Sequence, residues 1–259
     1  MVEKTTNSSV IINSVDRSLL ILEYLFNANE PVALTQISND MGIYKSTVYR
    51  TLATLQNRGY VVQDPVTDKY ELGFKVHLLG SRMQEASSLE KLVAPYAQDL
   101  ADRFGESVNV SKLSVDPYGI YVGIVIAKAS GDFALSSTIQ LGSVNHCYCS
   151  AVGKCLLAFT EGINLHVYDD HPMEAYTDTT ITSIKELREE LDSVRQNGYA
   201  IDNEENEPGL YCVAVPVLKD GEAVCAISLS GPKSRMKSDL DTKVKALKET
   251  AARISEEMI

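Results

Sequence analysis

The chain has 259 residues, a length that accommodates two domains with separate cores. Its hydrophobic fraction of 44% is that of a globular protein, and no apolar run approaches the length of a membrane span. Residues 1–13 contain no signal-peptide core, so we expect a disordered tail on a cytoplasmic protein with no membrane partner.

The net charge of −11 counts against general affinity for nucleic acids. However, residues 1–83 hold eight basic and eight acidic residues, so the excess acid lies in the rest of the chain. A neutral segment still binds DNA if its basic groups share one face. All five cysteines lie between positions 147 and 225, and we expect them to be reduced.

Residues 34–58 have the pattern of two short helices joined by a tight turn at Gly42. Apolar residues recur at helical spacing in both: Leu34, Ile37, Met41, Val48, Leu52 and Leu55. Polar and aromatic residues remain for the outer face, and they are the candidate DNA-binding residues: Thr35, Gln36, Tyr44, Lys45, Ser46, Thr47, Tyr49 and Arg50. The pattern predicts a helix-turn-helix whose second helix enters the major groove.

Residues 61–63 and 69–73 read as two strands around turn-forming residues 64–68, which is the pattern of a wing. Ahead of the helix pair, a further amphipathic helix is expected to close the small core with Val15, Leu19, Leu22, Leu25 and Phe26. We therefore predict a winged helix-turn-helix DNA-binding domain over residues 14–73. The alternatives are a plain helical hairpin, which the wing and the preceding helix disfavour, and a winged helix used for protein contacts, which the cationic face of the second helix disfavours.

Residues 74–86 are predicted to form a linker helix with Val76, Leu79 and Met83 on one face. This stripe packs either on its own domain or against a second copy. Because the helix joins two domains and dimers suit palindromic operators, we expect a second copy, giving a homodimer or homotetramer. Residues 87–259 are predicted to form an α+β domain with an antiparallel sheet. Its expected helices cover 89–104, with a kink or restart at Pro95, then 151–159, 184–197 and 238–258. Its expected strands cover 107–115, 120–127, 199–202, 211–217 and 223–230, the last one ended by Gly231 and Pro232.

Several segments resemble IclR-type bacterial transcriptional regulators. In the N-terminal part they are SVDRSLLILEYL, GIYKSTVYR and RGYV; in the C-terminal part they are YCSAVGKCLLAF, NGYAIDNEENEPGLYCVAVPV and AISLSGP. The resemblance implies a GAF-like domain that binds small organic or aromatic acids. Carried over by position, the implied effector-binding residues are Ala151, Val152, Asp202, Cys212, Ser228 and Ser230. The sequence departs from the family at Ala33, Tyr49 and Tyr148, where Ser or Thr, His, and His respectively are usual.

The residues themselves also favour a small carboxylate site. Ser228 and Ser230 are two apart on a strand, so their hydroxyls face the same side, and Ala151 begins a helix whose free amides attract anions. Taken singly, each serine is equally well explained as a buried hydroxyl that hydrogen-bonds to the backbone. Asp202 is, on its own, equally well explained as a turn cap. We predict a DNA-binding regulator, with repression of a catabolic operon as its expected action, controlled by a small carboxylate effector and needing no cofactor.

Two other functions remain open at the level of sequence. His146, Cys147, Cys149 and Cys155 lie within ten residues and suggest a metal- or thiol-sensing regulator, although Cys-x-Cys is not a usual zinc spacing. Cys212 with His146, or Ser228 with Asp202, suggests a Cys- or Ser-dependent hydrolase, although no nucleophile elbow is present. We therefore do not expect an enzyme.

Overall fold

The computed structural model describes residues 11–28, 30–86, 88–133 and 139–258. The chain divides into two compact units, an N-terminal unit of residues 1–87 and a C-terminal unit of residues 88–259. Most of the tail expected at 1–13 lies outside the described residues. Among the helices of the described ranges, none combines the length and apolar character needed to cross a membrane.

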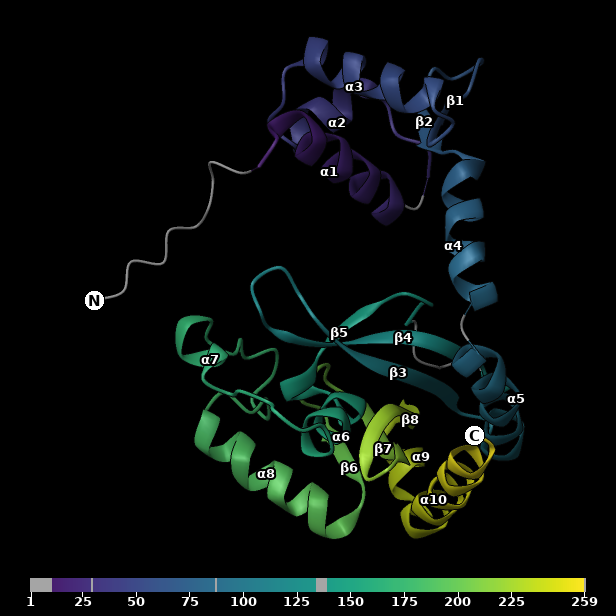
Figure 1. Cartoon of the computed structure of the whole chain (residues 1–259), viewed down its shortest axis with the longest axis vertical. Helices are drawn as coiled ribbons and strands as arrows, with labels where there is room; N and C mark the ends of the chain where they lie inside the picture. The colour runs from purple at the N-terminus through teal and green to yellow at the C-terminus, as the bar shows by residue number, and fades with distance from the viewer. Residues whose placement is uncertain (1–10, 29, 87, 134–138, 259) are drawn as a thin grey trace. The chain divides into compact units, whose positions relative to one another are not determined.

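The N-terminal unit consists of helices and a two-stranded sheet (Figure 1). Its elements are α1 (Asn13–Asn27), α2 (Leu34–Asp40), α3 (Lys45–Asn57), β1 (Val61–Gln63), β2 (Tyr70–Leu72) and α4 (Phe74–Ala86). A small core joins the three helices to the sheet: Ile21, Leu25, Val32, Ile37, Val48, Leu52, Leu55, Val61 and Tyr70. The antiparallel pairing of β1 with β2 confirms the predicted hairpin after α3.

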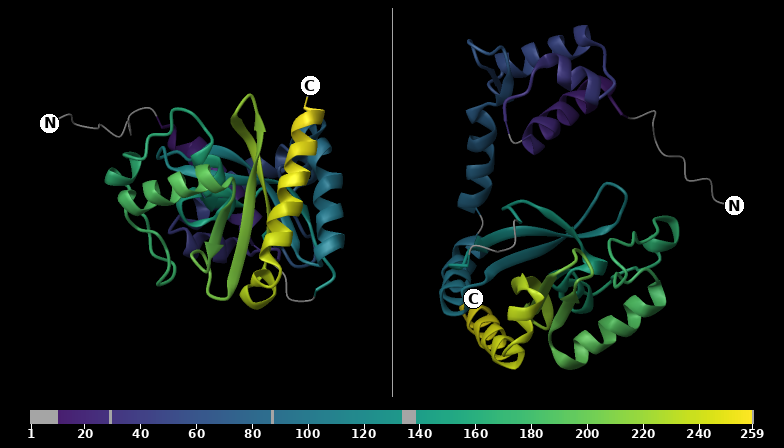
Figure 2. Two further views of the ribbon diagram at one scale, coloured as in Figure 1. Left: turned by 90° about the horizontal axis from the view of Figure 1, so that it is seen from below. Right: turned by 180° about the vertical axis from the view of Figure 1, so that it is seen from behind.

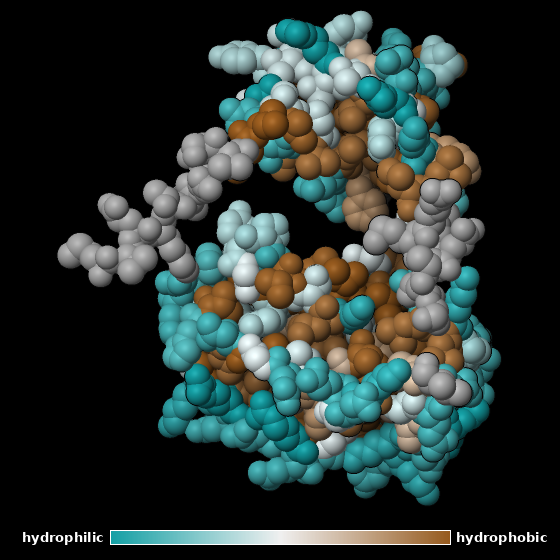
Figure 3. All heavy atoms as spheres, in the orientation of Figure 1, coloured by the Kyte–Doolittle hydropathy of each residue, from teal (hydrophilic) through white to brown (hydrophobic). Residues whose placement is uncertain are grey.

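The predicted core face of α1 was wrong in part. Val15, Leu19 and Phe26 are 53%, 53% and 65% exposed, whereas Ile21 and Leu25 are buried. The helix turns the stripe of Ile21 and Leu25 toward the small core, so the stripe of Val15, Leu19 and Phe26 is left exposed. Figure 3 shows hydrophobic residues gathered along α1.

The turn between α2 and α3 is held by a residue that the sequence did not single out. The hydroxyl of buried Ser38 donates to the carbonyl of Ile43 at 2.6 Å, and the amide of Ile43 donates to the carbonyl of Ser38 at 3.1 Å. Gly42 lies between them with φ +64°, a conformation that favours glycine. This reciprocal pair fixes the direction in which α3 leaves the turn.

The C-terminal unit has a six-stranded antiparallel sheet of order β5-β4-β3-β8-β7-β6 (Figure 1). The strands are β3 (Ser107–Val115), β4 (Tyr121–Ala129), β5 (Val144–His146), β6 (Ala200–Asn203), β7 (Leu210–Lys219) and β8 (Glu222–Pro232). The helices are α5 (Ser88–Phe104), α6 (Ala151–Ala158), α7 (Val167–Asp170), α8 (Ile184–Asn197), α9 (Lys233–Lys237) and α10 (Leu240–Glu257), with a 3₁₀ turn η1 (Cys147–Cys149). The short elements β5, η1, α7 and α9 were not predicted. The weak pattern of residues 133–141 predicts a loop, and this segment falls partly outside the described residues.

The sheet carries a separate core on each face. On one face, α5 and α10 lie side by side over strand residues such as Val110, Val213 and Ile227 (Figure 2). On the other face, α6 and α8 cover smaller strand residues, among them Cys212 and Ala214. Because side chains alternate along a strand, every strand residue contributes to one face or the other.

The predicted end of β8 before Gly231 was wrong, since the strand continues through Pro232. Gly231 pairs with Tyr211, and Pro232 pairs with Leu210 at the very end of the ladder. A Cβ on Gly231 would lie 2.2 Å from the carboxylate of Glu106, so glycine is needed here for close approach rather than for a turn. Pro95, likewise, does not interrupt α5.

Candidate DNA interface and effector site

The outer surface of α3 presents most of the predicted DNA-binding residues to solvent. Tyr44 precedes the helix and is 86% exposed, and Tyr49 is 59% exposed. The remaining candidates are also exposed, apart from a half-buried Thr47: Thr35, Gln36, Lys45, Ser46 and Arg50. Val48, Leu52 and Leu55 hold the opposite side of α3 in the core.

The cationic side chains of this surface have no acidic partner. Within the part of the chain that the structure describes, neither Lys45 nor Arg50 takes part in an ion pair. In the turn between β1 and β2, the amides of Val66 and Thr67 donate to the Asp64 carboxylate at 2.8 and 2.7 Å, which lowers the pKa of Asp64. The surface therefore offers uncompensated positive charge beside a structured hairpin, which suits a phosphate backbone.

On the α6 side of the sheet, cross-strand pairing brings three predicted effector residues into one row. Asp202 pairs with Cys212, and Cys212 pairs with Ser230. Ser107 of β3 extends the row, because it pairs with Ser230. In the next row Ser228 pairs with Ala214 and with Asn109, and its hydroxyl donates to the Asn109 carbonyl at 3.4 Å.

Three buried polar residues of β3, missed in the sequence, belong to the same face. Ser107, Asn109 and Ser111 are at most 3% exposed. Among the described residues, the hydroxyls of both serines and both ends of the Asn109 amide find no hydrogen-bond partner. A buried polar atom without a partner is costly, and a bound ligand or water is a usual explanation. The sequence signal that could have identified them is their spacing of two along residues 107–111, which places all three on one face of a strand.

Asp202 lies at the edge of this face, and its side chain is buried. Its Oδ1 accepts the amide of Glu205 at 2.8 Å, so the turn-cap interpretation holds for this oxygen. Burial raises the pKa of Asp202 to about 7, against the lowering effect of that hydrogen bond. Near neutral pH a large fraction of Asp202 is therefore a neutral carboxyl, able to donate as well as accept.

Fewer backbone amides are free at the N-terminus of α6 than an open anion site would offer. The Ser150 hydroxyl accepts the amide of Gly153 at 3.2 Å, which uses one of the free donors. The structure shows no hydrogen bond from the amides of Ala151 and Val152 to any residue that it describes. A Cβ on Gly153 would lie 2.2 Å from the Cα of Cys147, so the small residue at this position serves packing against η1.

A buried ion-pair network ties α6 to the neighbouring elements. Lys154 is 1% exposed, and its Nζ lies 2.6 Å from Glu205 and 3.0 Å from Glu190 of α8. Burial alone would lower the pKa of Lys154, but the two carboxylates raise it above its usual value. Because the Glu205 amide also holds Asp202, the network connects α6 to the polar face of the sheet.

The His146–Cys155 cluster does not have the form of a metal site. The described residues contain no group of three or more His, Cys, Asp or Glu side chains that could hold a metal ion. Burial raises the pKa of Cys149 and of Cys155 to about 12, which disfavours the thiolates that a metal needs. The His146 ring lies between Tyr148 and Tyr176, with centroids 5.6 and 6.1 Å away.

Models of two protein families match the chain. The IclR helix-turn-helix domain matches residues 14–65, and the "Bacterial transcriptional regulator IclR C-terminal" model matches residues 83–256. The chain belongs to the IclR family of bacterial transcriptional regulators. Its members are DNA-binding regulators rather than enzymes, so the hydrolase alternative is not supported.

IclR-family relatives match nearly the whole chain. The DNA-binding transcriptional repressor YiaJ of Escherichia coli K12 is 33% identical over 95% of this chain and 87% of its own length. The crystal structure of Thermotoga maritima IclR covers 96% of this chain and 99% of its own, with 27% identity and a TM-score of 0.77. An IclR homologue from Microbacterium hydrocarbonoxydans, complexed with 4-hydroxybenzoate, has the same fold at 21% identity, covering 94% of this chain and 98% of its own, with a TM-score of 0.79.

Proposed function

We propose that this IclR-family regulator reads operator DNA through α3 and is controlled by a small organic acid bound on the α6 side of its sheet. The observation that carries the effector half is the set of unpartnered polar atoms on β3 beside Ser228 and Ser230. Repression of a catabolic operon is the action we favour, because YiaJ is named a repressor. The expected location is the cytoplasm.

The DNA half of the proposal rests on the exposed surface of α3. Arg50→Ala is expected to weaken specific operator binding by about 1–3 kcal/mol if the guanidinium contacts a base edge. Lys45→Ala is expected to weaken binding to all sequences alike and to reduce the salt slope by roughly one unit, because it removes a phosphate contact. Fluorescence anisotropy with operator and unrelated duplexes, over a range of salt concentrations, measures both effects.

Arg58 provides the matched control for these variants. It is an exposed arginine at the C-terminal end of α3, outside the proposed DNA-binding residues. Arg58→Ala should therefore bind the operator much as the unmodified protein does. Unchanged binding by both Arg50→Ala and Lys45→Ala would show that another surface meets the DNA.

The effector proposal follows from the donors and acceptors on the sheet face. Asn109 offers an amide donor and an acceptor, and the serine hydroxyls offer both. The neutral form of Asp202 adds a carboxyl at the edge of the face. The amides of Ala151 and Val152 supply the positive end of a helix for a carboxylate. A small acid with a hydroxyl or oxo group satisfies these groups better than a plain fatty acid does.

We also propose that the protein is at least a dimer. Phe74, Leu78 and Leu79 of α4 are 69%, 52% and 51% exposed, whereas the side chain of Met83 lies outside the described residues. Together with the exposed stripe of α1, this apolar surface exceeds what isolated surface residues explain. Sedimentation velocity at micromolar concentration should give a dimer or tetramer; a monomer would contradict the proposal.

A further inference from the structure

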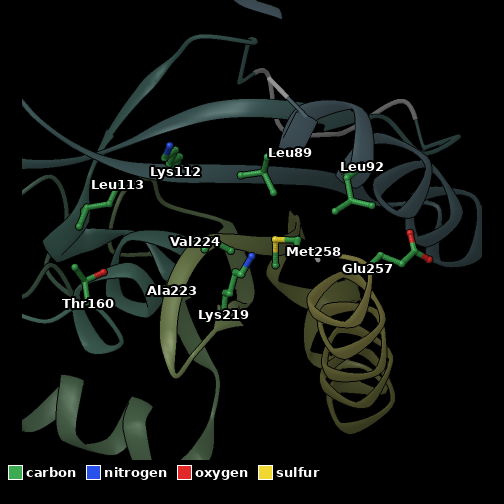
Figure 4. A pocket seen from close by; sticks show the side chains of 10 residues that line it. All are labelled: Leu89, Leu92, Lys112, Leu113, Thr160, Lys219, Ala223, Val224, Glu257 and Met258. Atoms are coloured by element: carbon green, nitrogen blue, oxygen red, sulfur yellow. The ribbon is translucent and has the colours of Figure 1, made fainter. Parts of the chain in front are cut away.

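A cavity of about 640 Å³ lies where β3 and β8 separate beyond the Ser111–Ala226 pair (Figure 4). Leu89, Leu92, Val224 and Met258 of its lining pack against the core under α5 and α10, whereas Leu113 and Ala223 pack against the core under α6. Its apolar lining comes from α5, from the strands and from the end of the chain: Leu89, Leu92, Leu113, Ala223, Val224 and Met258. The volume falls within the range of about 300–1,000 Å³ that small-molecule pockets occupy.

Two lysines give this apolar cavity a positive charge. Lys112 comes from β3 and Lys219 from the end of β7, and both are exposed. Strand alternation places Lys112 on the same face as Val108 and Val110, so its stem continues the core row while its ammonium reaches water. Neither lysine takes part in an ion pair with any residue of the described ranges.

One carboxylate in the lining offsets part of this charge, so two lysines and one glutamate leave the lining with a net charge of +1. Glu257, beside Leu92 in Figure 4, accepts the hydroxyl of Tyr96 at 2.5 Å. The Oγ1 of Thr160 is buried and finds no hydrogen-bond partner within the described part of the chain. The cavity thus combines an apolar wall, two lysines that form no ion pair among the described residues, one carboxylate and one unsatisfied hydroxyl.

We propose that this cavity is a second ligand site, for an amphipathic carboxylate with an aliphatic tail. The tail packs against Leu89, Leu92 and Val224, and the carboxylate lies between Lys112 and Lys219. The complementary charge favours an anion over an alcohol or an amine of equal length. The proposal does not depend on the effector site, because none of the proposed effector residues lines this cavity.

Titration calorimetry on the full chain with octanoate, octanol, octylamine and hexanoate tests this site. Octanoate should bind more tightly than octanol or octylamine, and lengthening the tail from hexanoate should tighten binding by up to about fourfold per buried methylene. Lys112→Gln and Lys219→Gln should each weaken octanoate binding about threefold, and the double variant about tenfold. Both lysines are exposed, so these variants should fold normally.

The controls separate this site from the alternatives. Lys185→Gln, at an exposed lysine of α8, and Ser230→Ala should leave octanoate binding unchanged. Equal binding of octanoate and octylamine, or full binding by the double lysine variant, would overturn the proposal. So would an absence of octanoate binding, whatever oligomeric state sedimentation shows.

Discussion

Lys154→Met is expected to destabilise the C-terminal unit by about 3–5 kcal/mol, because it leaves two carboxylates without their buried cation. Glu205 has a side chain only 8% exposed, and its Oε2 already lacks a partner among the described residues. Methionine keeps most of the apolar volume of lysine. The loss of stability is therefore caused by the missing charge rather than by a cavity. Urea denaturation of the full chain, followed by circular dichroism, measures the shift.

Three comparisons make this result specific. Lys154→Met with Glu205→Gln should recover part of the loss, because the unpaired charge on Glu205 is removed. The loss should also shrink as the pH falls, since the unpaired carboxylates can then take up protons. Lys185→Met, on the surface of α8, should change stability little. A loss below about 1 kcal/mol for Lys154→Met would show that the network contributes little.

Asn109→Leu and Ser230→Ala are expected to abolish the response of DNA binding to the effector while leaving operator affinity without effector nearly unchanged. Each removes polar atoms from the proposed site, and a coupling of about 1–3 kcal/mol is then lost. A thermal-shift screen of hydroxy, oxo and aromatic acids identifies a responsive ligand. Anisotropy with operator DNA then compares the variants with the unmodified protein.

The pH dependence gives a further test of this site. The pKa of Asp202 is raised to about 7, so the carboxyl is mostly neutral below that pH and charged above it. An anionic ligand should therefore bind more tightly below pH 7 and lose affinity as the pH rises through it. Asp202→Asn should flatten this profile. Retention of the full effector response by both Asn109→Leu and Ser230→Ala would place the site elsewhere.

Local chemistry explains the parts that could be predicted from sequence. The hydroxyl of Ser183 accepts the amide of Glu186, and Gly198 ends α8 with φ +71°, as the capping pattern indicates. The predicted bounds of β3 agree with the observed ones, because a run of residues between two turn-forming segments defines a strand locally. Such elements depend on neighbours in the chain.

The remaining features depend on distant contacts. Which stripe of α1 faces the core is decided by the helices it meets, so Leu19 and Ile21 could not be separated by periodicity alone. Ser107, Asn109 and Ser111 become buried polar residues only when β8 lies beside β3 and both faces of the sheet are covered. Gly153 is needed for the close approach of η1 to α6, a contact that the local sequence pattern does not indicate.

The burial of all five cysteines has a practical consequence for studying this regulator. Because no thiol is exposed in the folded C-terminal unit and the first cysteine in the chain is Cys147, the native protein offers modifying reagents no ready target. A single cysteine introduced on the surface of the N-terminal unit can therefore carry a fluorophore selectively. Movements of α3 can then be followed by spectroscopy without first removing the natural cysteines.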